Sequence, residues 1–325
     1  MSLIINYSLI PEGHQVPQAW FDARIQNYSG KREFIKTILV EEIAALQAFY
    51  LNQTSPDEAA QAITRPISNS SLPDLGTYSD EIVALVMLWN VLIKALIEWP
   101  PSRTPDIIAL LTAISKIPDK LHRGEAIDEG SPLAWNKLPY LEMPWRDAHW
   151  MHPSDILEKC SNDEAARQHS RDNYLKAKNV EAKLVAAGMF DMERPFFDLI
   201  YILEMKLDPA ERENNKAKVS NEDEPEAFEE FQPDFDIPAI VSWITHTGQK
   251  MYEILRENRT EYWNQENISC DRKHFDQPTE RWSFWQDRLN GVAKDAPDDF
   301  VRNSAELAIK YMQDIKYASE KTSSQ

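Results

Sequence analysis

Large apolar side chains return every three or four residues along most of this chain. The clearest case is residues 32–51, where one helix face would carry Phe34, Ile35, Ile38, Leu39, Ile43, Leu46 and Phe49. This spacing is typical of an amphipathic helix. No segment alternates apolar and polar residues convincingly over the length of a strand. The pattern therefore predicts an all-α fold.

The use of glycine and proline supports the same fold class. The chain has 8 glycines against 20 prolines, whereas strand-rich folds need glycine at their many turns and helical folds place proline in first turns. Loops are expected over residues 66–76 and 124–153, which are rich in proline. We predict one helix that begins at Ser55 and others over residues 32–51, 79–97, 104–114, 163–189, 196–207, 237–255, 276–289 and 297–318.

The domain organisation follows from where this pattern stops. Residues 208–235 hold many acids and few aliphatic side chains, so they offer little apolar surface to offset the entropy cost of ordering. The helices that follow look as if they complete the same core. We therefore predict a single compact domain over residues 1–325, built around an apolar cavity, with an acidic mobile insertion over residues 208–235.

The net charge of −18 limits the partners. Nucleic acids and anionic membranes both attract basic surfaces, so neither is expected as a partner. The most apolar stretch, Ile82 to Ile97, is shorter than a membrane span usually is, and we interpret it as a core helix. Two cysteines are too few for a disulfide framework, and the first residues lack the basic region of a signal peptide. These features favour a cytoplasmic protein.

A series of motifs in the last two-thirds of the chain resembles a known family. The series consists of Ala134-Trp135-Asn136-Lys137-Leu138-Pro139-Tyr140, Trp145-Arg146-Asp147, Asn173 to Leu184, Ile202-Leu203-Glu204, Val241-Ser242-Trp243-Ile244 and Glu280 to Leu289. It resembles a family of fungal helical proteins of unknown function, number three-six-three-two in that series, over about residues 132–316. The resemblance implies a fungal cytosolic protein and no particular activity.

In size, acidity and aromatic content the chain is also similar to fungal humulene synthases, which are all-helical and unlike ordinary terpene cyclases. This similarity implies a Mg²⁺-dependent sesquiterpene cyclase, a carbon–oxygen lyase that acts on farnesyl diphosphate. The partner molecule would be a prenyl diphosphate, and a homodimer is one candidate assembly. The alternative is a non-catalytic helical binding or scaffold protein of the same family.

A cyclase of this kind would need ligands for Mg²⁺. Some terpene cyclases use Asn/Asp-x-x-x-Ser-x-x-x-Glu, because four-residue spacing aligns the ligands on one helix face. The nearest match here is Asn173, Ala177 and Glu181, which lacks the serine, and Asp172 is the candidate substitute. The alternative is that Asn173 and Glu181 bind side chains of a neighbouring helix.

A cyclase would also need cationic side chains to bind the diphosphate. Arg281, Trp285 and Arg288 fall on one helix face, so the two arginines could hold a diphosphate beside an aromatic ring. The alternative is that each arginine stacks on a tryptophan or pairs with an acid. Asp198 and Glu204 lie in an otherwise apolar helix, where a carboxylate must be neutral, paired or bound to metal. Pairing with Arg or Lys is the commoner outcome.

Overall fold

The computed structural model describes residues 10–26, 33–69, 80–118, 134–160, 163–207, 231–262, 275 and 277–323. Every regular element in these ranges is an α-, 3₁₀- or π-helix. The prediction of an all-α fold is therefore confirmed. None of the helices in the same ranges is long and apolar enough to cross a membrane.

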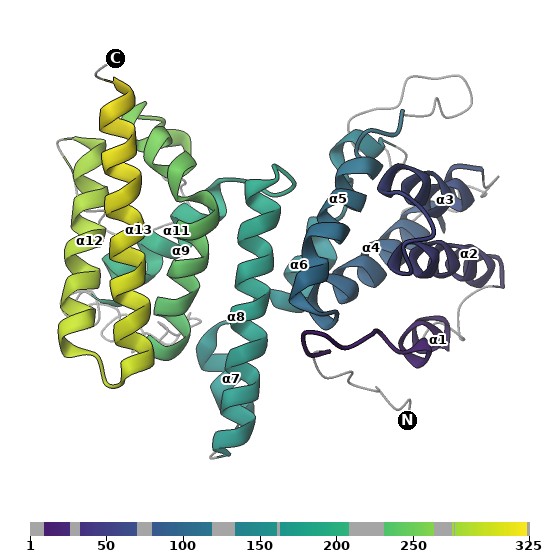
Figure 1. The fold of residues 1–325 in the computed structure, drawn as a ribbon, viewed down its shortest axis with the longest axis horizontal. Coiled ribbons are helices and arrows are strands. Elements are labelled where there is room, and N and C mark those ends of the chain that lie inside the picture. Colours follow the sequence, from purple (N-terminus) through teal and green to yellow (C-terminus); the bar gives the residue numbers. More distant parts are fainter. Residues whose placement is uncertain are drawn as a thin grey trace, which may run out of the picture. The chain divides into compact units, whose positions relative to one another are not determined.

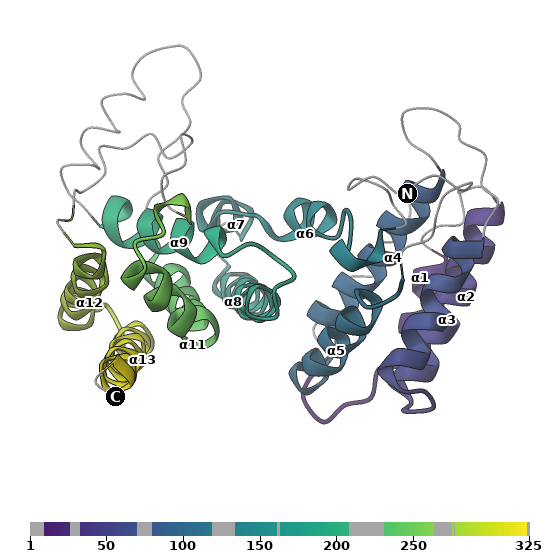
Figure 2. The same ribbon diagram turned by 90° about the horizontal axis from the view of Figure 1, so that it is seen from above.

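The chain divides into two compact units, residues 1–150 and residues 151–325. Figures 1 and 2 draw the helices of both units from two directions. Each unit packs its own helices around its own buried side chains, so each is described by itself. That residues 1–325 form one domain stays a prediction.

Unit 1 is a bundle in which α3 packs against α2 and α5, while α4 contacts α2, α5 and α6. The predicted core helix lies within α4, where Leu85, Trp89 and Leu92 are fully buried. The elements of unit 1 are α1 (Gln18–Gln26), α2 (Glu33–Tyr50), α3 (Pro56–Asn69), α4 (Asp80–Glu98), η1 (Pro101–Arg103), α5 (Thr104–Ile114), η2 (Trp135–Lys137) and α6 (Glu142–His149).

An aromatic cluster joins α1 to the ends of α2 and α4. The ring of Trp99 lies 5.4 Å from Trp20, 6.0 Å from Phe21 and 4.9 Å from Tyr50, measured between centroids. The indole of Trp20 also donates a hydrogen bond of 2.6 Å to Glu98. Edge-to-face rings with a satisfied polar group stabilise such a cluster beyond the area that they bury.

The predicted loop over residues 66–76 begins too early. Helix α3 continues through Pro66 to Asn69, and the rest of that loop lies outside the described residues. Proline inside a helix removes one backbone hydrogen bond and crowds the preceding turn. The next residue, Ile67, is fully buried in unit 1, and its burial offsets part of this cost.

Unit 2 is arranged around α11, which contacts α8, α9, α12 and α13. Figure 1 shows α11 between α8 and α13. The elements of unit 2 are α7 (Pro153–Cys160), α8 (Glu164–Ala186), α9 (Glu193–Leu199), η3 (Ile200–Lys206), α11 (Pro233–Arg256), η4 (Thr260–Tyr262), α12 (Pro278–Asp295) and α13 (Asp299–Ser323).

A π-helical turn, η3, continues α9 where the sequence predicts a single helix over residues 196–207. Such turns are rare and often occur at functional sites. Two charged residues of this turn are buried: Glu204 is 6% exposed and Lys206 is 1% exposed. The turn therefore carries charge into the interior of unit 2.

Most of the predicted acidic insertion, residues 208–230, lies outside the described residues. Its predicted end at residue 235 is wrong, because α11 already begins at Pro233 and Phe235 is fully buried. The ring of Phe235 lies 5.6 Å from that of Tyr174 in α8. One aromatic side chain thus anchors the first turn of α11, and a mobile acidic insertion over residues 208–230 stays a prediction.

Candidate functional site

The interior of unit 2 contains charged side chains that come from five helical elements and pair with one another. A buried charge is stable only when it is neutralised by a partner and hydrogen-bonded. The side chains are Lys178 and Glu181 in α8, Arg194 and Asp198 in α9, Glu204 and Lys206 in η3, Asp236 in α11 and Arg281 in α12.

Lys178 lies at the centre of the first group. Its Nζ is 2.8 Å from Asp198 Oδ2 and 3.3 Å from Glu181 Oε2. The other carboxylate oxygen of Glu181 lies 2.6 Å from Arg194 Nη1. The indole of Trp243 in α11 donates a hydrogen bond of 2.8 Å to Asp198 Oδ2. This group therefore joins α8, α9 and α11.

The charges of this group shift the pKa values of Lys178 and of the neighbouring Tyr174. Burial lowers the pKa of the Lys178 ammonium, but the carboxylates of Asp198 and Glu181 outweigh burial, and the pKa lies well above its ordinary value. Burial raises the pKa of the Tyr174 phenol, which Lys178 opposes. The nearby carboxylates, including that of Asp236, raise it further. At neutral pH, Lys178 is therefore a cation and Tyr174 a neutral phenol.

Glu204 is the centre of the second group. Its Oε1 lies 2.9 Å from Arg281 Nε and its Oε2 lies 3.4 Å from Arg281 Nη2. The indole of Trp285 donates a hydrogen bond of 2.7 Å to the same Oε1. The guanidinium of Arg281 also lies over the ring of Phe275, 5.0 Å from its centroid. The group ties the π-helical turn to α12.

A third pair links η3 to α11. The Nζ of Lys206 lies 3.3 Å from both carboxylate oxygens of Asp236, and each side chain is 1% exposed. The backbone N–H of Gln232 donates a hydrogen bond of 2.8 Å to Asp236. Because water does not reach this pair, each charge depends on the other for its stability.

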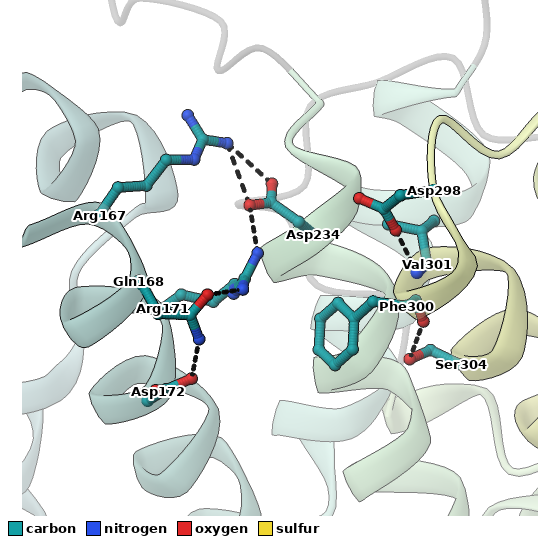
Figure 3. Close-up of polar contacts among 9 residues, drawn as sticks. All are labelled: Arg167, Gln168, Arg171, Asp172, Asp234, Asp298, Phe300, Val301 and Ser304. Atoms are coloured by element: carbon teal, nitrogen blue, oxygen red, sulfur yellow. Dashed lines mark hydrogen bonds and ion pairs between the residues drawn. The ribbon is translucent and has the colours of Figure 1, made fainter. Parts of the chain in front are cut away.

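A fourth group lies nearer the surface, near the starts of α8, α11 and α13 (Figure 3). Asp234 accepts hydrogen bonds of 3.0 Å from Arg167 to both oxygens and one of 3.1 Å from Arg171. The guanidinium of Arg171 lies 4.9 Å from the ring centroid of Phe300. Two arginines thus share one carboxylate, and one of them also contacts an exposed ring of α13.

The structure does not bring the predicted metal ligands together. Asn173 faces His169, with 3.0 Å between the amide nitrogen and the ring nitrogen, and Asp172 is exposed and accepts a hydrogen bond from Gln168. Glu181 is buried with a cation at each of its two oxygens. As they lie, these side chains do not fit a Mg²⁺ site, and Mg²⁺ binding stays a prediction. Within the described ranges, no three His, Cys, Asp or Glu side chains are grouped to hold a metal ion.

The predicted diphosphate residues are brought together in part. Arg281 and Trp285 lie side by side, but both face Glu204. Arg288 lies further along α12, with its guanidinium 5.0 Å from the ring centroid of Phe284. Glu204 therefore has the arginine partner that the sequence favoured, and Arg281 has the acid partner that was its alternative role.

A hollow of about 400 Å³ lies on unit 1. It contains none of the predicted site residues, and several of its side chains are exposed. The predicted apolar cavity stays a prediction. The hollow is lined by Glu58, Gln61, Ala62, Thr64, Arg65, Ser68, Asn69, Ile117 and Pro118.

Comparison with known families places most of the chain in one of them. A family described as protein of unknown function (DUF3632) matches residues 89–289, which is more than half of the chain. The chain belongs to this family. No curated protein and no solved structure matches the chain, so the similarity to humulene synthases has no support from these comparisons.

The DUF3632 region begins within α4 and ends within α12. It therefore includes all three buried groups, with Lys178, Glu204 and Lys206 at their centres. Helix α13 lies beyond the region. The family description assigns no activity, so the function must be argued from the buried charges themselves.

Sequence reasoning missed several partners in this DUF3632 region. Lys178 and Glu181 are three residues apart on one helix, so their shared face could be read from the sequence. Lys206 and Asp236 are thirty residues apart in different helices. No local spacing relates them, but each interrupts an apolar face, and this was the signal that identified Glu204.

Proposed function

We propose that this DUF3632 protein is a non-catalytic helical binding or scaffold protein. One observation carries the proposal: the charged side chains that a prenyl diphosphate enzyme would need are already neutralised by each other. Mg²⁺ needs available carboxylates and a diphosphate needs available cations. Here Glu181 is held by Lys178 and Arg194, and Arg281 is held by Glu204.

Paired interior charges suit a scaffold, because they favour one packing arrangement over others. A helix that slid by one turn would leave a charge such as Lys206 buried without Asp236, at a cost of several kcal/mol. The bundle is thereby expected to present a fixed surface. With a net charge of −18, that surface is complementary to a partner with a basic face.

The proposal predicts how the protein responds to a cyclase's ligands. Melting of the wild-type chain should be unchanged by Mg²⁺ and farnesyl diphosphate, and no terpene should form. Glu181→Gln should melt at a lower temperature, because removing the charged partner of the buried Lys178 and of Arg194 costs about 3–5 kcal/mol. Asp172→Asn is the control, since Asp172 is exposed, and it should melt like the wild type. Calorimetry and analysis of volatile products measure these outcomes.

The second candidate is the Mg²⁺-dependent sesquiterpene cyclase. The observation that favours it is a chain of aromatic rings beside Glu204, because ring faces stabilise carbocations. Trp285 lies 6.3 Å from Phe196 and 6.1 Å from Trp282, measured between centroids. A melting temperature raised by Mg²⁺ and farnesyl diphosphate together, with a terpene product, would establish the cyclase and exclude the non-catalytic proposal.

A further inference from the structure

A polar contact joins α8 to α11, which lie side by side in unit 2 (Figure 1). The amide nitrogen of Asn179 in α8 lies 3.2 Å from Nε2 of His246 in α11. Twelve residues earlier on each helix, Arg167 binds Asp234. Equal spacing along both helices means that α8 and α11 run in the same direction, so residues equally far beyond Asn179 and His246 lie at one level.

The next level of the two helices carries two lysines. Lys183 and Lys250 each lie four residues, about one turn, beyond Asn179 and His246 respectively. Lys183 is half-buried and Lys250 is exposed. Within the described residues, neither lysine has an ion-pair partner. These four side chains, which we call the α8–α11 basic group, therefore hold two lysines and a histidine without a carboxylate among them.

The pKa values in the α8–α11 basic group show the effect of this composition. Burial lowers the pKa of Lys183. Burial, followed by the Lys183 cation, lowers the pKa of His246. Burial lowers the pKa of Lys178 as well, but there two carboxylates outweigh burial. Lys183 and His246 lack such compensation, and an anion held beside them would supply it.

The charged side chains around His246 come from α8 and from α11 itself. The acids on this side, Asp172 and Glu253, each lie seven residues, about two turns, from the contact between Asn179 and His246. Each of them accepts a hydrogen bond from a glutamine of its own helix. The bases lie closer to the contact; they are Lys176, Lys183 and Lys250.

We propose that the α8–α11 basic group binds a tetrahedral dianion, namely phosphate, either free or as the phosphoryl group of a larger molecule. Two ammonium groups and a protonated imidazole would donate charge-assisted hydrogen bonds to its oxygens. The whole chain has a net charge of −18 and repels anions, so local cations must select the ligand. This inference does not rest on the proposed function, since a scaffold and an enzyme can both hold such an anion.

Sulfate is the first probe, because it keeps its double charge from about pH 5 to pH 8, where histidine titrates. Proton NMR of the full-length chain follows the imidazole of His246, whose signal is identified by its loss in His246→Gln. Sulfate should raise the pKa of His246, because the anion favours the protonated ring. By linkage, sulfate affinity should fall as pH rises through that pKa. The affinity of His246→Gln should lack this pH dependence.

Variants of Lys183 separate a binding site from an isolated histidine. Lys183→Gln should weaken sulfate binding about tenfold, the effect of one charge-assisted hydrogen bond. Lys183→Arg keeps the charge and should retain most of the affinity. Lys310→Gln is the matched control, because it makes the same change at an exposed position of α13. Melting curves without sulfate should lie close to that of the wild type in all three variants, which shows that each is folded.

Inorganic phosphate and phosphoserine, tested in the same way, identify the source of the anion. Equal affinities support free phosphate as the ligand, and tighter binding of phosphoserine supports a phosphorylated molecule. A His246 signal that does not respond to sulfate overturns the proposal. A response of equal size and affinity in Lys183→Gln and in the wild type overturns it as well.

Discussion

Arg281→Met should lower the free energy of unfolding by about 3–5 kcal/mol, the usual cost of removing one partner of a buried ion pair. Arg281 and Glu204 are each about 5% exposed, so Glu204 would be left charged in the interior. The indole of Trp285 would still donate to it. Denaturant unfolding of the full-length chain measures this loss.

The control for Arg281→Met is Arg288→Met, which removes the same side chain from a less buried position of the same helix. It should cost less than Arg281→Met, because Arg288 is half-buried whereas Arg281 is buried. Glu204→Met alone should be as damaging as Arg281→Met. The double variant should lose less than the sum of the two, because an apolar pair of similar volume often replaces a buried ion pair at little cost.

Equal losses from Arg281→Met and Arg288→Met would contradict the view that the Glu204 group holds η3 against α12. The pattern of coupling matters more than any single value. In a double-mutant cycle, the stability losses of two residues that contact each other are not additive. The losses of two residues that each bind a ligand separately are additive when the ligand is absent.

The fold class could be predicted from the sequence because helical spacing is a local property. Residues 32–51 and 237–255 carry their apolar side chains at three- and four-residue intervals, and both lie largely within helices, α2 and α11. The ends of helices were harder to predict where a tertiary contact outweighs the local helix propensity. Burial of Ile67 carries α3 past Pro66, and burial of Phe235 starts α11 earlier than predicted.

The candidate site was predictable only in part, for a related reason. The sequence shows that Glu204 and Arg281 lie on apolar faces, so each needs a polar partner. It does not show that they face each other, because 77 residues separate them. Asn173 and Glu181 share the spacing of a ligand motif, yet Asn173 faces His169 and Glu181 faces Arg194. Spacing on one helix selects a face and leaves the neighbouring helix unspecified.

Glu42 in α2 is a buried acid of a different kind. It is 2% exposed, and within the described residues its Oε1 has no hydrogen-bond partner. Burial, with a further contribution from the neighbouring Glu41 carboxylate, raises the pKa of Glu42 well above its ordinary value. The folded chain therefore holds the proton of Glu42 more tightly than an ordinary glutamate does, on an acid with an unsatisfied oxygen. Such a group costs stability, and the cost depends on pH.

Glu42→Met should therefore raise the free energy of unfolding. In acid the gain should be about 1–3 kcal/mol, because the substitution there only removes the unsatisfied polar group. The gain should increase as pH rises. Above the ordinary pKa of a glutamate the unfolded state ionises while the folded state keeps its proton, so wild-type stability falls until pH passes the folded pKa.

Glu42→Gln separates the two contributions, because the amide has no charge to titrate but still leaves a polar group unsatisfied. It should abolish this part of the pH dependence and recover little stability in acid. Glu41→Gln is the control, since Glu41 is exposed, and it should leave most of the pH dependence in place. Denaturant unfolding from about pH 4 to pH 8 spans the range from the ordinary glutamate pKa upward. If the advantage of Glu42→Met over the wild type stays constant across that range, Glu42 does not bind its proton more tightly in the folded state. The acid would then be ionised and solvated at a position that the structure leaves only 2% exposed.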